Sequence, residues 1–411
     1  MVWNEIVSCR LCGDRALSRV LDLGVQALSS RFPRPDEPDP PRVPLVLVRC
    51  DACGLAQLRH SVDTSELYTE AYGYRSGINQ SMRTQLGSIA AEVAGVAGLR
   101  PGDVVVDIGC NDGTLLGAYP VAGLARVGVD PILEKFRDVL PPGVFAVPRY
   151  FSAEAISPAL DGRRARAVTA IAMFYDLEDP HAFVVDIACI LAPDGVCVLE
   201  QSYMPTMLAC NAFDTVCHEH REYYTFRQID ELTRRHGLRV FDVRLNEVNG
   251  GSMRVFVCHR SGPYPAREVS IGAVVAAEVE LRLDTFEPFA AFEKRITALR
   301  EETVAFVTQE CARGRTFIAY GASTKGNTLL QYYGLDRRLI MAAAERNPEK
   351  YGRRTPATAI PIISEAEARA RRPDYFLVLP WHFRDEFVER EAEFLRAGGH
   401  LVFPLPRLEV V

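Results

Sequence analysis

The stretch DVVVDIGCNDGTLL, residues Asp103 to Leu116, decides the fold of this chain. Its first half is an apolar run typical of a buried β-strand, and its second half is a glycine-containing loop that leads into a helix. A strand, a glycine loop and a helix in this order form the unit with which open parallel sheets bind nucleotides. The loop departs from the dinucleotide pattern G-x-G-x-x-G because Asn111 stands in place of the second glycine, and Asp107 lies within the end of the strand.

Strand and helix patterns continue on both sides of this loop. A helix is predicted from about Asn79 to Gly98. A second strand ends at Asp130, ~20 residues after Asp107, where an acid can bind both hydroxyls of a ribose. These patterns predict an α/β protein with a central Rossmann-like domain over residues 79–262. Its further strands are expected at 167–177, 195–203, 238–246 and 252–260, the last two as a hairpin about Asn249, Gly250 and Gly251.

Two C-x-x-C pairs lie near the start of the chain, and each is followed at once by a glycine. Four thiolates at this spacing suit a tetrahedral zinc with a closed coordination shell, which makes the site structural. The alternative is four unrelated cysteines. We expect residues 1–78 to form a small module whose folding depends on zinc, with the proline-rich stretch Pro33 to Pro44 as an extended surface excursion. The predicted ligands are Cys9, Cys12, Cys50 and Cys53.

A second strand, glycine loop and helix are predicted in RTFIAYGASTKGNTLLQYYG, residues 315–334. A long helix from about Pro288 to Gly314 precedes it, so residues 263–411 are expected to form a Rossmann-like C-terminal domain. The loop narrowly misses the P-loop pattern because its lysine comes before the second glycine, which argues against a triphosphate hydrolase. Backbone amides, two hydroxyls and one lysine at a helix N-terminus still suit a diphosphate. A tight turn without a ligand is the alternative.

The segment DTVCHEHREYYTF, residues Asp214 to Phe226, carries the residue types that move protons near neutral pH. His218, Glu219 and His220 are followed closely by a further carboxylate and two phenols. The histidines are two positions apart, whereas the zinc-protease pattern H-E-x-x-H needs four. A catalytic segment, a two-histidine metal site on an extended strand, and a polar loop with one buried histidine all remain open at this point.

The composition narrows the class of protein. The chain has 411 residues, 48% hydrophobic and 24% charged, which fits a soluble protein of two or three domains. A net charge of −6 argues against binding to nucleic acid through phosphate contacts. No apolar run approaches the ~20 residues of a membrane span, and the first residues lack the layout of a signal peptide. The eleven cysteines do not form a disulfide pattern. We therefore expect a cytoplasmic protein that binds neither nucleic acid nor a membrane.

The glycine loop, the acid after the second strand and the terminal hairpin together resemble a class I S-adenosylmethionine (SAM) methyltransferase. The whole chain resembles the sugar C-methyltransferases that act on nucleotide-linked 4-keto-deoxysugars. That family combines an N-terminal four-cysteine zinc module, a central methyltransferase domain and a C-terminal Rossmann-like domain, and all three patterns occur here in that order. The resemblance implies that Asp107, Gly109, Asn111, Asp112 and Gly113 surround the amino-acid part of SAM and that Asp130 binds its ribose.

The resemblance also implies the reaction, which is methylation of C3 of a 4-keto-2,6-dideoxysugar linked to thymidine diphosphate (TDP), as in antibiotic-type deoxysugar biosynthesis. The 4-keto group acidifies the hydrogen on C3, so the enzyme needs a base and donors for the enolate oxygen. His220 is the expected base, with Glu219 beside it. Cys217 stands where some family members have a tyrosine, so a phenol cannot be carried over to that position.

Further residues are assigned from these requirements. His218 is expected to orient or pack, and Tyr72 or Tyr224, with Tyr223 as a substitute, to donate to the enolate oxygen. The residues expected to bind the substrate are Tyr74, Glu200, Ser323, Lys325, Asn327 and Glu345.

Two other functions compete with this interpretation. One is a nicotinamide-dependent 4-ketoreductase of the same sugars, alone or as a second activity with NADPH, because two Rossmann-like units permit it. The other is a zinc-ribbon RNA methyltransferase, against which the acidic balance counts. The expected cofactors are therefore SAM and a structural zinc, with NADPH as an alternative. The expected partner is the TDP-sugar, and the expected assembly is a monomer or a weak homodimer.

Overall fold

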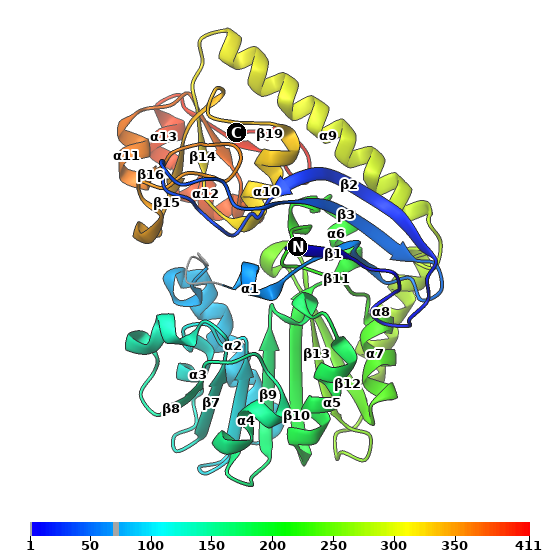
Figure 1. Ribbon diagram of the computed structural model, residues 1–411. Coiled ribbons are helices and arrows are strands. Elements are labelled where there is room, and N and C mark those ends of the chain that lie inside the picture. Colours follow the sequence, from blue (N-terminus) through cyan, green and yellow to red (C-terminus); the bar gives the residue numbers. More distant parts are fainter. Residues whose placement is uncertain (1, 69–73) are drawn as a thin grey trace.

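The computed structural model describes residues 2–68 and 74–411. Four β-sheets organise this part of the chain. Figure 1 shows the seven-stranded central sheet in the lower half of the molecule and the six-stranded C-terminal sheet in the upper half. No helix within residues 2–68 and 74–411 combines the length and the apolar character needed to cross a membrane.

The central sheet has the strand order β12-β13-β10-β9-β6-β7-β8. Its strand β6 is buried along its whole length, which explains the uninterrupted apolar run in the sequence. β13 is antiparallel to both β10 and β12, so the predicted terminal hairpin is confirmed. The strands are β6 (Val104–Ile108), β7 (Ala125–Val129), β8 (Val144–Val147), β9 (Ala165–Ile171), β10 (Leu191–Ser202), β12 (Leu238–Asn246) and β13 (Ser252–His259).

Helices cover both faces of this sheet, and separate apolar clusters fill the space beneath them. The helix expected from about Asn79 to Gly98 is α2 (Gln80–Ala97), which ends at the left-handed Gly98. The others are α3 (Thr114–Gly117), α4 (Ala153–Leu160), α5 (Pro180–Ile190), α6 (Met204–Ala209) and α7 (Phe226–Arg235).

The N-terminal sheet has the order β11-β4-β3-β2. Its edge strand β11 comes from the segment that carries His218 and His220, so that segment is built into the N-terminal sheet. The proline-rich stretch links β2 to β3 and is exposed in its middle, as expected, but Asp39 pairs with Arg354 of the C-terminal domain. The elements are β1 (Trp3–Glu5), β2 (Leu17–Ala27), β3 (Arg42–Cys50), β4 (Ala56–Leu58), β5 (His60–Val62), α1 (Thr64–Leu67) and β11 (Glu222–Tyr223).

The C-terminal sheet has the order β16-β15-β14-β17-β18-β19, so the strand order reverses at β14. Open α/β sheets bind ligands in the crevice at such a reversal. Its strands are β14 (Phe317–Tyr320), β15 (Ile340–Glu345), β16 (Ile362–Ser364), β17 (Tyr375–Val378), β18 (His400–Phe403) and β19 (Glu409–Val410). Its helices are α10 (Thr324–Tyr333), α11 (Glu365–Ala370), α12 (Arg384–Arg390) and α13 (Ala392–Arg396).

Two helices connect the central and C-terminal domains, α8 (Glu268–Glu280) and the long α9 (Glu287–Ala312). Helix α9 contacts β2, α6 and α10, which belong to the N-terminal, central and C-terminal parts respectively. Figure 1 shows it running along one side of the molecule beside β2. The helix braces the larger domains, as the unbroken pattern in the sequence predicted.

Candidate active site

The first of two adjoining cavities lies at the carboxyl ends of β6, β7 and β9. Its volume is about 370 Å³, which is within the range of small-molecule sites. The glycine loop forms part of its wall: Gly109 has a φ of +71°, and a Cβ there would lie 2.9 Å from the side chain of Met173. Gly109, Asn111, Asp130, Ile132, Tyr150, Phe151 and Met173 are among the residues that line it.

Asp130 has the geometry expected of a ribose ligand. Its carboxylate accepts hydrogen bonds from the backbone amides of Asn111 and Ile132, both at 3.0 Å, and the side chain lines the cavity. Burial raises the pKa of Asp130, and the two amides act in the opposite direction. The carboxylate is therefore held in place with acceptor positions left for a ligand.

Three residues expected around SAM are not part of the cavity wall. Asp107 is buried and accepts a hydrogen bond of 2.6 Å from the hydroxyl of Thr169. Asp112 accepts from the backbone amide of Gly77 at 2.9 Å and so ties the loop to the segment before α2. A Cβ on Gly113 would lie 2.7 Å from Pro141, which explains the glycine by packing. These three residues support the conformation of the glycine loop through contacts outside the cavity.

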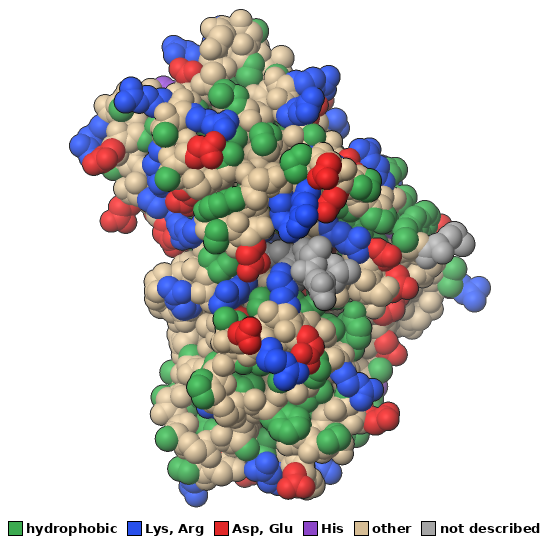
Figure 2. Space-filling model, turned by 60° about the vertical axis from the view of Figure 1, so that its left-hand side comes forward, with side chains coloured by type: hydrophobic (Ala, Val, Ile, Leu, Met, Phe, Trp, Pro, Cys, Tyr) green, Lys and Arg blue, Asp and Glu red, His purple; other side chains and the backbone are tan. Residues whose placement is uncertain are grey.

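A second cavity of about 340 Å³ lies between the central and C-terminal domains. It adjoins the first cavity, because six residues, named below, belong to the lining of both. Basic side chains of the C-terminal domain and Arg75, which precedes α2, line the second cavity, and Figure 2 shows Lys and Arg on either side of the junction between the upper and lower parts of the molecule. The shared lining residues are Tyr74, Met82, Ala172, Tyr175, Asp176 and Asn249.

His220 lines the second cavity beside Tyr175, with the two ring centroids 4.2 Å apart. Its Nδ1 lies 2.8 Å from the carbonyl oxygen of Thr215. A carbonyl can only accept, so Nδ1 carries the hydrogen and Nε2 keeps its lone pair. Burial, and then the charge of Lys325, lower the pKa of His220 to about 3. The imidazole is therefore neutral at physiological pH and able to accept a proton.

Glu219 lines the same cavity as His220. It is buried, and neither of its carboxylate oxygens has a hydrogen-bond partner within residues 2–68 and 74–411. A buried carboxylate with unused acceptors on a cavity wall is suited to a ligand hydroxyl or amide. The structure thus brings His220 and Glu219 together in one cavity.

Other residues of this segment face elsewhere. His218 is buried and donates from Nε2 to the carbonyl of Val43 in β3 at 3.2 Å. The two histidines therefore contact different elements and do not form a two-histidine metal site. Tyr224 is buried against Phe174, with centroids 5.3 Å apart, away from both cavities, so its expected role as donor to the enolate is wrong. Tyr72 lies outside the described residues.

The phenol of Tyr223 supports the turn that holds His220. It donates to the backbone carbonyls of His220 at 3.0 Å and of Thr215 at 3.3 Å. Cys217 is fully buried behind the turn, and its carbonyl accepts from the amide of His220 at 3.1 Å. Tyr223 is therefore occupied with the backbone and is not a substitute donor.

The residues expected to bind the substrate divide into two groups. Tyr74 lines both cavities, and Ser323, Lys325 and Glu345 line the second. Two others have their polar groups engaged by the protein itself. Glu200 lies on the wall of the first cavity, where Arg254, Asn246 and Gln85 donate to its carboxylate. Asn327 is buried and donates to the carbonyl of Ser29 at 2.7 Å, so it joins α10 to the N-terminal domain.

Two residues of the shared wall were missed in the sequence. Tyr175 comes just after β9, whose carboxyl end faces the first cavity, and this position was the available signal. Asn249 lies in the turn between β12 and β13, with the left-handed φ of 57° that favours asparagine. The sequence indicated a turn at Asn249, but it could not show that the C-terminal domain packs beside this turn and completes a cavity there.

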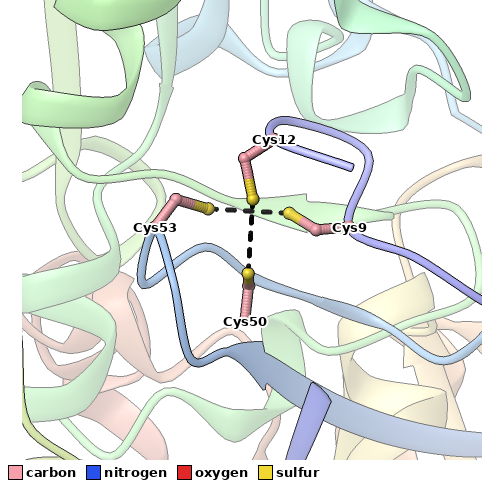
Figure 3. Close-up of side chains that lie close together, drawn as sticks. All are labelled: Cys9, Cys12, Cys50 and Cys53. Carbon is pink, nitrogen blue, oxygen red and sulfur yellow. Dashed lines mark hydrogen bonds between the residues drawn. The ribbon is translucent and has the colours of Figure 1, made fainter. Parts of the chain in front are cut away.

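The four predicted zinc ligands come together near the N-terminus (Figure 3). Their sulfur atoms all lie within 4.8 Å of one another, with Cys9 to Cys53 at 3.6 Å and Cys12 to Cys50 at 3.5 Å. Zn–S bonds of about 2.3 Å in a tetrahedron require sulfurs about 3.8 Å apart. The cluster fits one zinc ion with a closed shell of thiolates.

Three family models match successive parts of the chain. A zinc binding domain matches residues 9–68, a methyltransferase domain matches residues 79–243, and a C-methyltransferase C-terminal domain matches residues 247–406. Among solved structures, mitomycin 7-O-methyltransferase MmcR is 19% identical over 44% of this chain and 54% of its own, with a TM-score of 0.36. The magnesium protoporphyrin IX methyltransferase ChlM of Synechocystis PCC 6803 is 15% identical over 46% of this chain and 86% of its own, with a TM-score of 0.34.

One curated relative matches along nearly the whole chain. The C-methyltransferase NovU of Streptomyces niveus is 31% identical over 413 residues, which cover 99% of this chain and 97% of NovU. The predicted α/β fold class is confirmed, whereas the reductase and the RNA methyltransferase gain no support from these similarities. The chain therefore belongs to the SAM-dependent C-methyltransferase family, whose members join a zinc-binding domain, a methyltransferase domain and a C-methyltransferase C-terminal domain.

Proposed function

We propose that this enzyme methylates C3 of a TDP-linked 4-keto-2,6-dideoxysugar in a deoxysugar pathway of the antibiotic type. The observation that carries the proposal is the position of His220. Its unprotonated Nε2 belongs to a ring that lines the second cavity, which adjoins the cavity lined by Gly109, Asn111 and Asp130. A carbon acid bound in the second cavity would have a base on one side and a methyl donor on the other.

The chemistry follows from the sugar's carbonyl. The ketone at C4 acidifies the hydrogen on C3, and His220 removes it through Nε2. The C–H electron pair forms a double bond between C3 and C4, and the negative charge moves to the oxygen on C4. When bound, SAM supplies an electrophilic methyl group. Glu219, with its free acceptors, would hold a hydroxyl of the sugar or stabilise the imidazolium that forms on His220.

The second cavity is lined by both carboxylates and basic side chains, and the basic ones would bind an anionic substrate. A neutral imidazole with a pKa near 3 is a weak base in the empty cavity. A bound diphosphate brings negative charge, which raises the pKa of a nearby imidazole. Lys350 and Arg346 line the second cavity near the carboxyl end of β15, where they would attract this substrate. Binding of the substrate would therefore raise the basicity of His220.

Each of the three domains would have a separate role in the reaction. We assign residues 1–78 to a zinc-stabilised module that supports the segment carrying His220, residues 79–262 to SAM binding, and residues 263–411 to the nucleotide part of the substrate. Asn111 and Gly109 would face the amino-acid part of SAM, and Asp130 its ribose. Zinc would have a structural role, because four thiolates leave no open coordination position.

The test is an incubation of purified enzyme with SAM and a panel of TDP-linked keto-sugars, read by mass and by NMR. A gain of one methylene, with the new methyl on C3, supports the proposal. The matched control is the same sugar with a hydroxyl at C4, which offers no acidic C–H. Methylation of the control, or a methyl found on oxygen, would refute the enolate mechanism. NADPH added in parallel, with absorbance followed at 340 nm, tests the ketoreductase.

A further inference from the structure

The side chain of Lys325 points away from the glycine loop of the C-terminal domain and toward the central domain. It lies in the first turn of α10, yet its ammonium group donates to the carbonyl of Asn249 at 3.0 Å. Asn249 lies in the turn between β12 and β13 of the central domain and lines both cavities. The side chain therefore crosses from the C-terminal domain to the junction between the cofactor cavity and the substrate cavity.

The turn between β12 and β13 packs against Trp381 of the C-terminal domain. A Cβ on Gly250 would lie 3.2 Å from the ring of Trp381, and the indole of Trp381 donates to the carboxylate of Asp214 at 3.0 Å. Asp214 belongs to the same segment as His220, so the C-terminal domain approaches that segment and the turn together. Burial lowers the pKa of His220 and of His382 and raises the pKa of Asp214, and the charge of Lys325 acts on all three in the lowering direction.

The loop itself is poorly prepared for a diphosphate. The amide of Ala322 donates to the carboxylate of Glu345 at 2.9 Å, and the amide of Gly326 donates to the hydroxyl of Ser323 at 3.0 Å. Groups that would cradle a phosphate are thus occupied by side chains of the protein. With Lys325 directed at Asn249, the expectation that this lysine binds the diphosphate loses its geometric basis.

We propose that Lys325 is a catalytic residue that donates a hydrogen bond to the oxygen on C4 of the sugar while His220 removes the proton from C3. This inference rests on the proposed function. The carbon that reacts must lie between the cofactor cavity and His220, and Lys325 is at that junction. C3 and C4 are bonded to each other, so a base for C3 and a cation for the oxygen on C4 must face the same cavity, as His220 and Lys325 do.

The electron count is simple. The C3–H bond breaks and its proton goes to Nε2 of His220. The electron pair of that bond forms the C3–C4 double bond, and the π electrons of the carbonyl move to the oxygen on C4. The ammonium group of Lys325 neutralises the negative charge on this oxygen. Methyl transfer reverses the electron flow: the new C–C bond forms at C3, the ketone is restored and S-adenosylhomocysteine leaves. The charge that weakens His220 as a base in the empty cavity stabilises the enolate that this base produces.

The test uses Lys325→Gln, which removes the charge and shortens the side chain by one bond, so the charged donor to the sugar oxygen is lost. Loss of one donor to an oxyanion costs about 10²–10³ in kcat, so we expect that loss with the inhibition constant for free TDP within about threefold of the parent. Lys294→Gln, at an exposed position of α9, is the matched control for loss of one positive charge. A raised inhibition constant for TDP with kcat retained would overturn the inference in favour of a diphosphate ligand.

A second readout needs no substrate. In protein labelled at histidine, the imidazole of His220 can be titrated by NMR, with its signal assigned from the spectrum of His220→Asn. Lys325→Gln should raise the pKa of His220 because it removes a positive charge from the cavity. An unchanged titration would show that the ammonium does not act on the base. A parent enzyme inactive toward every keto-sugar would overturn the proposed function together with this inference, whereas a parent-like kcat in Lys325→Gln would overturn this inference alone.

Discussion

His220→Asn is the substitution that most directly tests the proposed reaction. The amide nitrogen of asparagine can take the place of Nδ1 and keep the hydrogen bond to the carbonyl of Thr215, which is 2.8 Å long in the parent. The substitution therefore removes Nε2, the proposed proton acceptor, while it keeps the contact that positions the ring. The variant should fold, and it should bind SAM and the sugar nucleotide as the parent does.

The expected loss is a factor of about 10²–10⁴ in kcat, the usual contribution of a positioned base. At 1.36 kcal/mol for each tenfold change, this corresponds to about 3 to 5 kcal/mol of the activation free energy. The assay is the initial rate of methyl incorporation at saturating concentrations of both ligands. An independent assay follows deuterium exchange at C3 in D₂O without SAM, which the variant should abolish if the parent supports it.

His218→Asn is the matched control, because it makes the same change two positions away. His218 is buried and donates to Val43 in the N-terminal sheet. A shorter side chain cannot reach that carbonyl, so the loss should be about 1 to 3 kcal/mol of unfolding free energy, with kcat changed far less than in His220→Asn. A kcat in His220→Asn within tenfold of the parent would refute the assignment, and Glu219 would become the candidate base.

Three further predictions address the cofactor, the metal and pH. Asp130→Ala should raise the dissociation constant of SAM about 10- to 100-fold, since a charge-assisted hydrogen bond contributes ~1.5–3 kcal/mol; unchanged affinity in calorimetry would remove Asp130 from the site. Metal analysis should find about one zinc per chain, and Cys12→Ser should lower the melting temperature before it lowers kcat; folded, active protein without zinc would contradict this. Because the pKa of His220 is lowered to about 3, the base of the free enzyme stays neutral as pH falls through 6.5, so kcat/KM should show no acidic limb from His220 near 6.5. Below pH 6.5 His220 binds a proton in the unfolded chain but not in the folded protein, so its contribution should make the fold less stable as pH falls from 6.5 toward 3. An acidic limb of kcat/KM at 6.5 that disappears in His220→Asn would contradict the lowered pKa.

The parts of the fold that could be predicted from the sequence depend on local patterns. The buried strand before Gly109 is apolar at successive positions, and the glycine that follows has the positive φ that lets the loop approach the cavity. The four cysteines were found for the same reason, because the C-x-x-C spacing with a following glycine is a local feature. Asp130 was found from its distance along the chain to Asp107, which the strand–helix–strand unit sets.

The direction of a side chain could not be predicted where distant segments decide it. Tyr223 and Tyr224 are adjacent, and the pairing of β11 with β4 determines which phenol faces the turn and which enters the core. Asn327 was assigned to the substrate because it follows a glycine loop, but the N-terminal domain packs against α10 and takes its amide. Glu200 was assigned to the substrate, and three donors from other elements contact its carboxylate.

The segment that carries His220 is held from two sides, by the zinc-binding domain and by the C-terminal domain. Arg10, which lies between two of the cysteines, is buried with its guanidinium 3.5 Å from Glu222 of β11. It also donates to the carbonyl of Leu58 at 3.1 Å, in the strand that pairs with β11. From the opposite side Trp381 of the C-terminal domain donates to Asp214. His220, the proposed base, thus lies in a segment that contacts both the zinc-binding domain and the C-terminal domain, so a loss of either contact should displace it relative to both ligands.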